Sequence, residues 1–177
     1  GSASGELLRQ SSESLAGRIG FLRLRGFSQQ EVGSETLGPL WLRGGFPRSF
    51  LAATDAASFE WRRAFVATFL ERDLPQLGVR TPSETLRRFW TMLAHYHGQR
   101  WNGAELARAF GLSESSVRRY LDLLTDALVV RQLPAWHANV AKRQVRAPKV
   151  FVEDSGLLHV LLGIADAQAL ESHPKVG

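Results

Sequence analysis

The stretch that most constrains the fold is residues 105–124, ELARAFGLSESSVRRYLDLL. Ala107 is small enough to let two helices approach closely, and Gly111 supplies the permissive backbone that a tight turn requires. The buried face of a following helix is predicted at the spacing i, i+3, i+4 and i+7 by Val117, Tyr120, Leu121 and Leu124. The stretch therefore predicts a helix-turn-helix.

The neighbouring residues extend this motif on both sides. TPSETLRRFWTMLAHYHGQR, residues 81–100, has an amphipathic pattern with a heavy aromatic face. Asn102 and Ser113 are predicted to cap the two helices of the motif. Strands are predicted over 128–136 and 149–156, with a turn or wing over 137–148 between them. Three helices followed by a β-hairpin is the order of a winged helix.

The first half of the chain has weaker signals. We predict a helix over 6–17, a strand over 18–28 and a loop over 33–39, before Gly44, Gly45 and Pro47 break regular structure. A longer helix is predicted over 55–73, and Pro75 and Gly78 are predicted to end it. Its apolar face includes the position of the Arg62/Arg63 pair. The predicted fold class is mainly α with minor β: a helical N-terminal part and a winged helix-turn-helix.

Composition excludes some classes of site. The chain has 177 residues and no cysteine, which excludes disulfides and cysteine-based metal sites. Its five histidines have no metal-binding spacing, so neither a metal-ligating nor a catalytic residue is predicted. No apolar run is long enough to span a bilayer, and no signal peptide is present, so we expect a cytoplasmic protein with no membrane partner. The five tryptophans are predicted to anchor the core: Trp41, Trp61, Trp90, Trp101 and Trp136.

The net charge of +5 suits an anionic partner. In a helix-turn-helix that reads DNA, the outward positions near the start of the second motif helix face the major groove. The candidate DNA-binding residues on this helix are Ser115, Ser116, Arg118 and Arg119. The wing and the strand after it add Lys142, Arg143, Arg146 and Lys149 as candidate phosphate contacts. The alternative is that the same arginines lie on a solvated helix face and that the module contacts protein.

Five segments in a fixed order resemble a known family. They are GSAS followed by LLRQSSESLAGR, then LRGGFPRSFLA, FLERDLPQLG, the helix-turn-helix, and KVFVEDSGLLHVLLGI. This order resembles the C-terminal part of prokaryotic AAA-type P-loop ATPases of the archaeal and STAND-like group, which carry a winged helix and a C-terminal domain of unknown function. The resemblance covers essentially the whole chain.

The resemblance implies what this chain would contribute. The phosphate-binding GxxxxGK[ST] loop of such an ATPase does not occur in these residues, so ATP and magnesium are expected in the parent protein and no cofactor in this chain. The resemblance makes Ser2 and Ser4 candidate sensors of the γ-phosphate and Arg18 a candidate nucleotide-sensing arginine. The alternative for Arg18 is a cation at a helix C-terminus.

The resemblance also implies three consecutive segments. Residues 1–79 are expected to hold a remnant of the ATPase core and a helical linker or lid, 80–152 the winged helix-turn-helix, and 153–177 the start of a truncated C-terminal module. That module is similar to a restriction-endonuclease-like fold, in which Glu153 and Asp154 are candidate magnesium ligands. The favoured alternative is that Asp154 or Ser155 caps the next helix.

Three hypotheses about function remain open at this point. The first is a non-catalytic fragment of an AAA-type ATPase whose winged helix couples DNA or a protein partner to the ATPase, with self-association through the ATPase core. The second is an autonomous DNA-binding regulator, and the third is a protein-protein interaction module. The chain starts within GSASGELLRQ and stops at HPKVG, which favours the first.

Gly44, Gly45 and Pro47 form either a ligand-facing loop or a tight connection.

Overall fold

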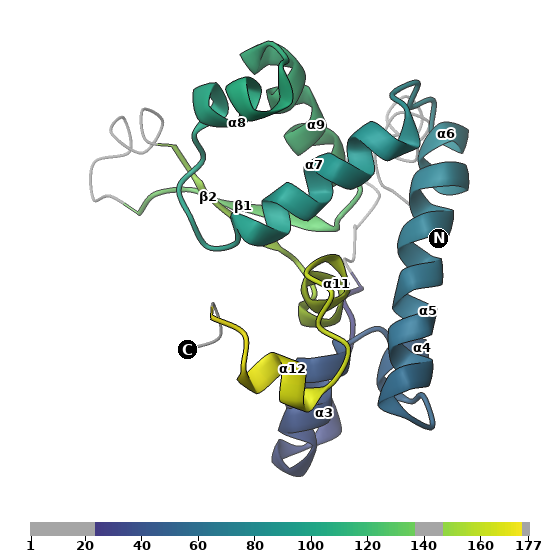
Figure 1. The fold of residues 1–177 in the computed structure, drawn as a ribbon. Helices are drawn as coiled ribbons and strands as arrows, with labels where there is room; N and C mark the ends of the chain where they lie inside the picture. Colours follow the sequence, from purple (N-terminus) through teal and green to yellow (C-terminus); the bar gives the residue numbers. More distant parts are fainter. Residues whose placement is uncertain (1–23, 137–146, 175–177) are drawn as a thin grey trace, which may run out of the picture. The chain divides into compact units, whose positions relative to one another are not determined.

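The computed structural model describes residues 24–136 and 147–174 of the chain (Figure 1). It is mainly helical with one two-stranded antiparallel sheet, so the predicted fold class, mainly α with minor β, is confirmed. None of the described helices is long and apolar enough to cross a membrane. The helices of the first half are α2 (Gln29–Val32), a 3-10 turn (Ser34–Thr36), α3 (Leu37–Arg43), α4 (Pro47–Phe50), α5 (Asp55–Thr68), a π-helical turn (Phe69–Asp73) and α6 (Leu74–Gln76). They are followed by α7 (Ser83–His95), α8 (Gly103–Phe110), α9 (Glu114–Asp126), β1 (Val130–Leu133), β2 (Lys149–Val152), α11 (Ser155–Leu161) and α12 (Ala167–Glu171).

The described residues group into two compact units. We call residues 88–136 and 147–153 the first unit, and residues 24–87 and 154–174 the second unit. This division differs from the three consecutive segments predicted from the sequence. Residues 154–174 pack with elements of the first half, because α11 contacts α3 and α5. They are therefore not a separate third part of the described chain.

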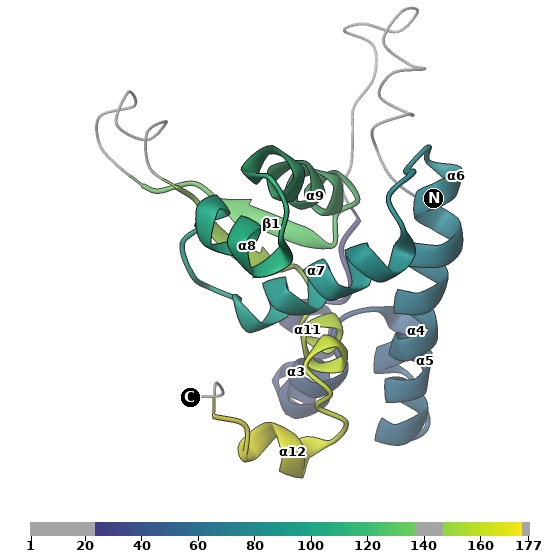
Figure 2. The ribbon, with the colours of Figure 1, turned by 45° about the horizontal axis from the view of Figure 1, so that its top comes forward.

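The first unit has a core built from the predicted inward faces. Phe89, Trp90 and Leu93 of α7 are fully buried, and Phe89 makes edge-to-face contacts with the rings of Phe110 and Tyr120 at centroid distances of 5.7 and 5.6 Å. The inner face of α9 is buried as the spacing predicts, through Val117, Tyr120, Leu121 and Leu124. Within this unit α8 lies beside α9, and α9 contacts β1 (Figure 2).

Local side chains set the limits of the two motif helices. The Asn102 side chain accepts a hydrogen bond from the backbone N–H of Glu105 at 3.2 Å, and Ser113 does the same for Ser116 at 3.2 Å. Both are N-caps, which satisfy donors that have no partner inside a helix. Gly111 ends α8 in the left-handed conformation with φ of 64°. The predicted caps and the predicted turn are confirmed.

The sheet pairs Val130 with Val152 and Leu133 with Lys149. A third segment, between α7 and α8, pairs with the other edge of β2. Gly98 N–H donates to the Val150 carbonyl at 2.7 Å, and Val150 N–H donates to the Gln99 carbonyl at 3.0 Å. The sequence did not predict this pairing, because three residues are too few to show an alternating pattern.

Two predictions for the second unit are wrong. The predicted loop over 33–39 contains the 3-10 turn and the start of α3. Pro39 is compatible with α3 because it lies in the first turn, where backbone N–H groups have no intrahelical partner. The described part of the predicted strand over 18–28 is not a strand; Phe27 N–H makes a single hydrogen bond to the Gly45 carbonyl at 2.7 Å. The helix predicted over 6–17 lies outside the described residues.

The long helix of the second unit changes its geometry before Pro75. The N–H of Leu74 bonds to the carbonyl of Phe69, five residues earlier, which makes a π-helical turn. In a regular α-helix the ring of Pro75 would collide with the carbonyl of Glu71. The wider turn lets the helix continue through α6, and Gly78 follows with φ of 84°. The predicted helix over 55–73 is present, and it runs three residues further.

Candidate nucleic-acid interface

The outward side of α9 brings four predicted site residues together. Ser115, Arg118 and Arg119 are exposed, and Ser116 is half-buried. The hydroxyl groups of Ser115 and Ser116 both lie 2.9 Å from that of the capping residue Ser113. We call Ser115, Ser116, Arg118 and Arg119 the α9 surface.

The two arginines of the α9 surface have different neighbours. Arg118 Nε lies 3.0 Å from Asp122 Oδ2, one turn further along the helix, and both side chains are about half exposed, at 49% and 46%. Exposed pairs at this spacing are worth only about 0.3–0.5 kcal/mol, so a phosphate can replace the aspartate at small cost. The guanidinium carbon of Arg119 lies 5.7 Å from the ring centroid of Tyr120. Both arginines are thus held against the helix surface but remain accessible.

The remaining predicted cations are divided between the sheet and undescribed residues. Lys149 is the first residue of β2 and is exposed. Lys142, Arg143 and Arg146 lie outside the described residues, as do the nucleotide-sensing candidates Ser2, Ser4 and Arg18. Arg100 was not predicted as a site residue, yet it is exposed and lies directly opposite Lys149. No local pattern could have indicated Arg100, because its position depends on the unpredicted pairing of residues 98–101 with β2.

The tryptophan prediction is only partly right. Trp90 is fully buried, and Trp61 and Trp101 are half-buried. Trp41 is 50% exposed and Trp136 is 82% exposed, so neither is a core anchor. Trp136 follows the end of β1, and most of its surface is exposed to solvent. A hydrophobicity pattern cannot distinguish such a surface tryptophan from a buried one.

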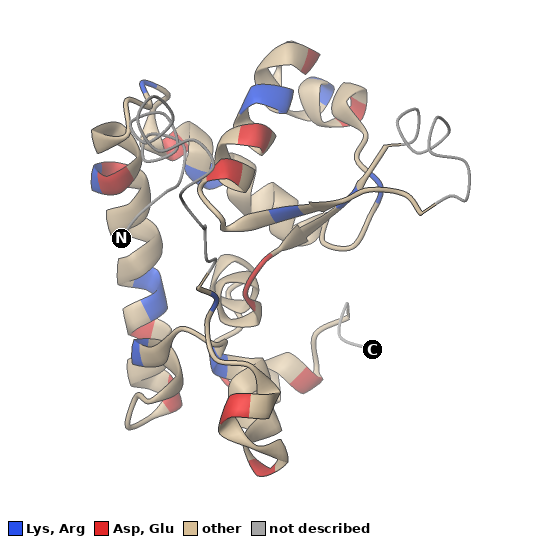
Figure 3. Ribbon diagram, turned by 180° about the vertical axis from the view of Figure 1, so that it is seen from behind, with Lys and Arg blue, Asp and Glu red and all other residues tan. Residues whose placement is uncertain are grey.

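Charge is concentrated in one part of the chain. Residues 88–153 contain ten Lys or Arg and five Asp or Glu, a net charge of +5. The whole chain is also +5, so the remaining residues are neutral in sum. Figure 3 shows basic and acidic positions interspersed along the helices of the ribbon. The anionic partner expected from composition is therefore expected to contact residues 88–153.

In the second unit the polar residues around Arg62 are turned inward. The fully buried guanidinium group of Arg62 donates to the carbonyls of Leu42 and Gly156, both at 3.0 Å, and to that of Ser58 at 3.2 Å. Burial lowers the pKa of Arg62 to about 10, an effect that the nearby carboxylate of Asp154 opposes. Arg62 therefore fastens α5 to the ends of two other segments by hydrogen bonds to their backbones.

Asp154 has the capping role that was the favoured alternative from the sequence. One carboxylate oxygen accepts from the N–H of Leu157 at 2.9 Å, and the other accepts from the N–H of Gly45 at 2.8 Å. Burial raises the pKa of Asp154, and these N–H donors and Arg62 act in the opposite direction. Because both oxygens bind backbone groups, they are not directed at a metal ion. The described residues contain no group of three His, Cys, Asp or Glu residues that could hold one.

The Gly44-Gly45 loop is a tight connection and not a ligand-facing loop. Both glycines are buried, and Gly44 has φ of 77°. A Cβ atom at Gly44 would collide with the carboxylate of Asp154. The pair is therefore needed for the close approach of this loop to the start of α11.

Comparison with known proteins places the chain in a family. Residues 34–168 match the model of a domain of unknown function, DUF8612. The chain belongs to the DUF8612 family. The matched residues include both the α9 surface and the buried hydrogen bonds of Arg62 and Asp154, so both features lie within the DUF8612 domain.

Two longer proteins are similar to the whole chain. An uncharacterized protein of Mycobacterium bovis and one of Mycobacterium tuberculosis are each 58% identical over all 177 residues. The chain spans about 40% of the length of these relatives. No solved structure matches the DUF8612 chain.

Proposed function

We propose that this chain is a non-catalytic segment of a larger AAA-type ATPase and that its first unit is a winged helix-turn-helix that contacts duplex DNA. The chain spans about 40% of its curated relatives, which leaves room for a nucleotide-binding core in the rest of those proteins. Five sequence segments resemble this ATPase group, and the chain itself lacks a GxxxxGK[ST] loop. ATP and magnesium would bind the parent, and the DNA contact would be coupled to its ATP hydrolysis. Such a protein would act in the cytoplasm.

The order and pairing of the elements support a winged helix. Three helices precede a two-stranded antiparallel sheet, and the segment between the first two helices pairs with the second strand. In this arrangement α9 corresponds to the helix that enters the major groove of DNA. Its exposed N-terminal half presents two hydroxyl groups and two arginines.

The observation that carries the DNA proposal is the location of the charge. Residues 88–153 account for the whole net charge of +5, and Arg118 and Arg119 are exposed on α9. Cationic side chains on one module favour a polyanion, and the resulting affinity falls with salt because counterions are released. The competing proposal is that the same exposed surface of α9 docks on a protein.

A salt-dependent titration distinguishes the two proposals. Fluorescence anisotropy of a labelled duplex is measured with the chain at about 50 mM and about 200 mM salt. Replacing both Arg118 and Arg119 by Ala should weaken binding and reduce the slope of log affinity against log salt by about 0.9 for each phosphate that is no longer neutralised. The matched control replaces Arg63 and Arg72, whose side chains are 61% and 66% exposed in the second unit, and removes the same total charge.

Equal effects of the two double variants would reject the α9 surface as the DNA contact. Absence of duplex binding at the lower salt concentration would favour the protein-docking proposal.

The ATPase part of the proposal has separate tests. This chain should show no ATP binding in isothermal titration, and the remaining part of the mycobacterial relatives should contain a GxxxxGK[ST] loop. Micromolar ATP affinity of the chain alone would contradict the proposal.

A further inference from the structure

Two cations lie side by side on the outer face of the sheet. Lys149 of β2 is paired with Leu133 of β1 on one side and bridges Arg100 on the other. Residues directly opposite each other in neighbouring strands project from the same face, with Cβ atoms about 4.5–5.5 Å apart. Leu133, Lys149 and Arg100 therefore form a row across three segments of the chain.

This pair of like charges has no compensation within the described residues. Like charges directly opposite each other destabilise a sheet. Neither Arg100 nor Lys149 has a carboxylate partner in the part of the chain that the structure describes. An anion bound between them would convert the repulsion into two attractive contacts.

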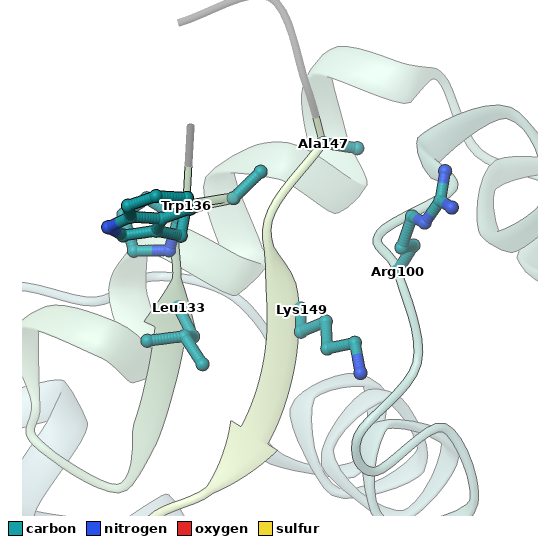
Figure 4. A pocket seen from close by; sticks show the side chains of 7 residues that line it. Arg100, Leu133, Trp136, Ala147 and Lys149 are labelled. Atoms are coloured by element: carbon teal, nitrogen blue, oxygen red, sulfur yellow. The ribbon is translucent and has the colours of Figure 1, made fainter. Parts of the chain in front are cut away.

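Arg100 and Lys149 line two hollows that contain aromatic rings. One, of about 460 Å³, is lined by Arg100, Leu133, Trp136, Ala147 and Lys149 together with Pro134 and Ala135. Figure 4 shows Leu133 and Trp136 on one side of Lys149 and Arg100 on the other. The second hollow, of about 620 Å³, shares Arg100, Ala147 and Lys149 and adds Tyr96 and Trp101. We call these two hollows, together with Arg100 and Lys149, which line both, the Arg100–Lys149 groove.

The composition of the groove indicates one class of ligand. Proteins bind single-stranded nucleic acid by combining cations that contact the backbone with aromatic rings on which successive bases stack. Trp136 is 82% exposed and Leu133 is 40% exposed, so an apolar surface is open beside the cations. In duplex DNA the faces of the bases are already stacked on each other and are not accessible to Trp136.

We propose that the Arg100–Lys149 groove binds single-stranded DNA, with a phosphate between Arg100 and Lys149 and a base against Trp136. This site is separate from the α9 surface, and it does not depend on duplex binding there. A chain with both sites would bind DNA where a duplex meets a single strand.

The test uses the full chain and a fluorescein-labelled oligo-dT, with anisotropy measured at about 50 mM and about 200 mM salt. Arg100→Gln and Lys149→Gln should each weaken binding and lower the salt slope by about 0.7, the value for one phosphate of a single strand. Trp136→Ala should weaken binding by about 5- to 150-fold, whereas Trp136→Phe should retain most of the affinity because a ring remains. Oligo-dT should also quench tryptophan fluorescence in the unmodified chain, and Trp136→Phe should lose part of this quenching.

Arg108→Gln is the matched control, because Arg108 is an exposed arginine of the same unit that does not line either hollow. The proposal is overturned if Arg108→Gln weakens oligo-dT binding as much as Arg100→Gln does, or if Trp136→Ala leaves the affinity unchanged. It is also overturned if an acidic peptide binds the groove and oligo-dT does not. Replacing Arg118 and Arg119 should reduce duplex binding but leave oligo-dT binding intact, so the two proposals can fail independently.

Discussion

Arg62 is expected to be the most important polar residue for the stability of the second unit. Its guanidinium group is fully buried and makes three hydrogen bonds to backbone carbonyls, of Ser58, Leu42 and Gly156. Hydrogen bonds from a charged group contribute about 1.5–3 kcal/mol each. Burial of the charge opposes this gain, and the pKa of about 10 compared with 12.5 corresponds to about 3 kcal/mol. The net contribution of Arg62 is therefore a few kcal/mol.

Arg62→Met removes the charge and all three donors but fills a similar volume. Asp154 then loses a nearby cation while it remains partly buried. Three buried carbonyl contacts lose a charged donor, and the cost of burying the charge is relieved at the same time, so we expect a net loss of about 3 kcal/mol. That is a large share of the total stability of a small domain, about 5–15 kcal/mol. Arg62→Lys should recover only part of the loss, because an ammonium group cannot reproduce the planar fork of donors.

The neighbouring Arg63 provides a matched control on the same helix. Its side chain is 61% exposed and pairs with Glu60, which is 66% exposed. Exposed pairs contribute about 0–1 kcal/mol, so Arg63→Met should change the unfolding free energy by less than about 1 kcal/mol. Urea denaturation followed by circular dichroism measures the total change. Hydrogen exchange of peptides from α5 and α11 shows whether the loss lies in the second unit.

Two results would refute this reasoning. If Arg62→Met and Arg63→Met had equal unfolding free energies, the hydrogen bonds of Arg62 would only cancel the cost of burying its charge and would make no net contribution to the unfolding free energy. If Arg62→Met were more stable than the unmodified chain, the cost of burying the charge would exceed the gain from its hydrogen bonds, as happens for some buried ion pairs.

Two further predictions concern Gly44 and Asp154. Gly44→Ala should destabilise the chain by more than about 1 kcal/mol in urea denaturation, because φ is 77° and the new Cβ collides with Asp154. Burial raises the pKa of Asp154 in the folded chain, so the folded state binds the Asp154 proton more tightly than the unfolded state does. This tighter proton binding stabilises the fold at low pH, and the stabilisation is lost as pH rises through the folded-state pKa. As pH rises above the ordinary aspartate pKa of about 4, the unmodified chain should therefore lose stability relative to Asp154→Asn, and parallel pH profiles would refute the assignment.

The elements that could be predicted from the sequence are those with local causes. The two motif helices have a cap at Asn102, a cap at Ser113 and a left-handed glycine at Gly111, all within 12 residues of one another. Each of these signals acts over three or four residues, so the sequence alone indicates where the helices begin and end. The helix α3 was missed because Gly38 and Pro39 resemble a loop, although a first helical turn tolerates both.

The long-range contacts could not be predicted in the same way. The apolar stripe predicted for α5 passes through Arg62, so the sequence placed this residue on the inner face. Its partners Leu42 and Gly156 lie 20 and 94 residues away, and a backbone carbonyl has no sequence signature. The pairing of Arg100 with Lys149 is likewise set by the fold of three separated segments. The candidate groove is thus visible only in the structure, whereas the α9 surface follows from the motif.

The charged side chains are placed differently in the two units. Residues 88–153 carry the whole net charge, and Arg118, Arg119 and Lys149 among them are exposed. The second unit turns Arg62 and Asp154 inward, where they fix the ends of α3 and α11.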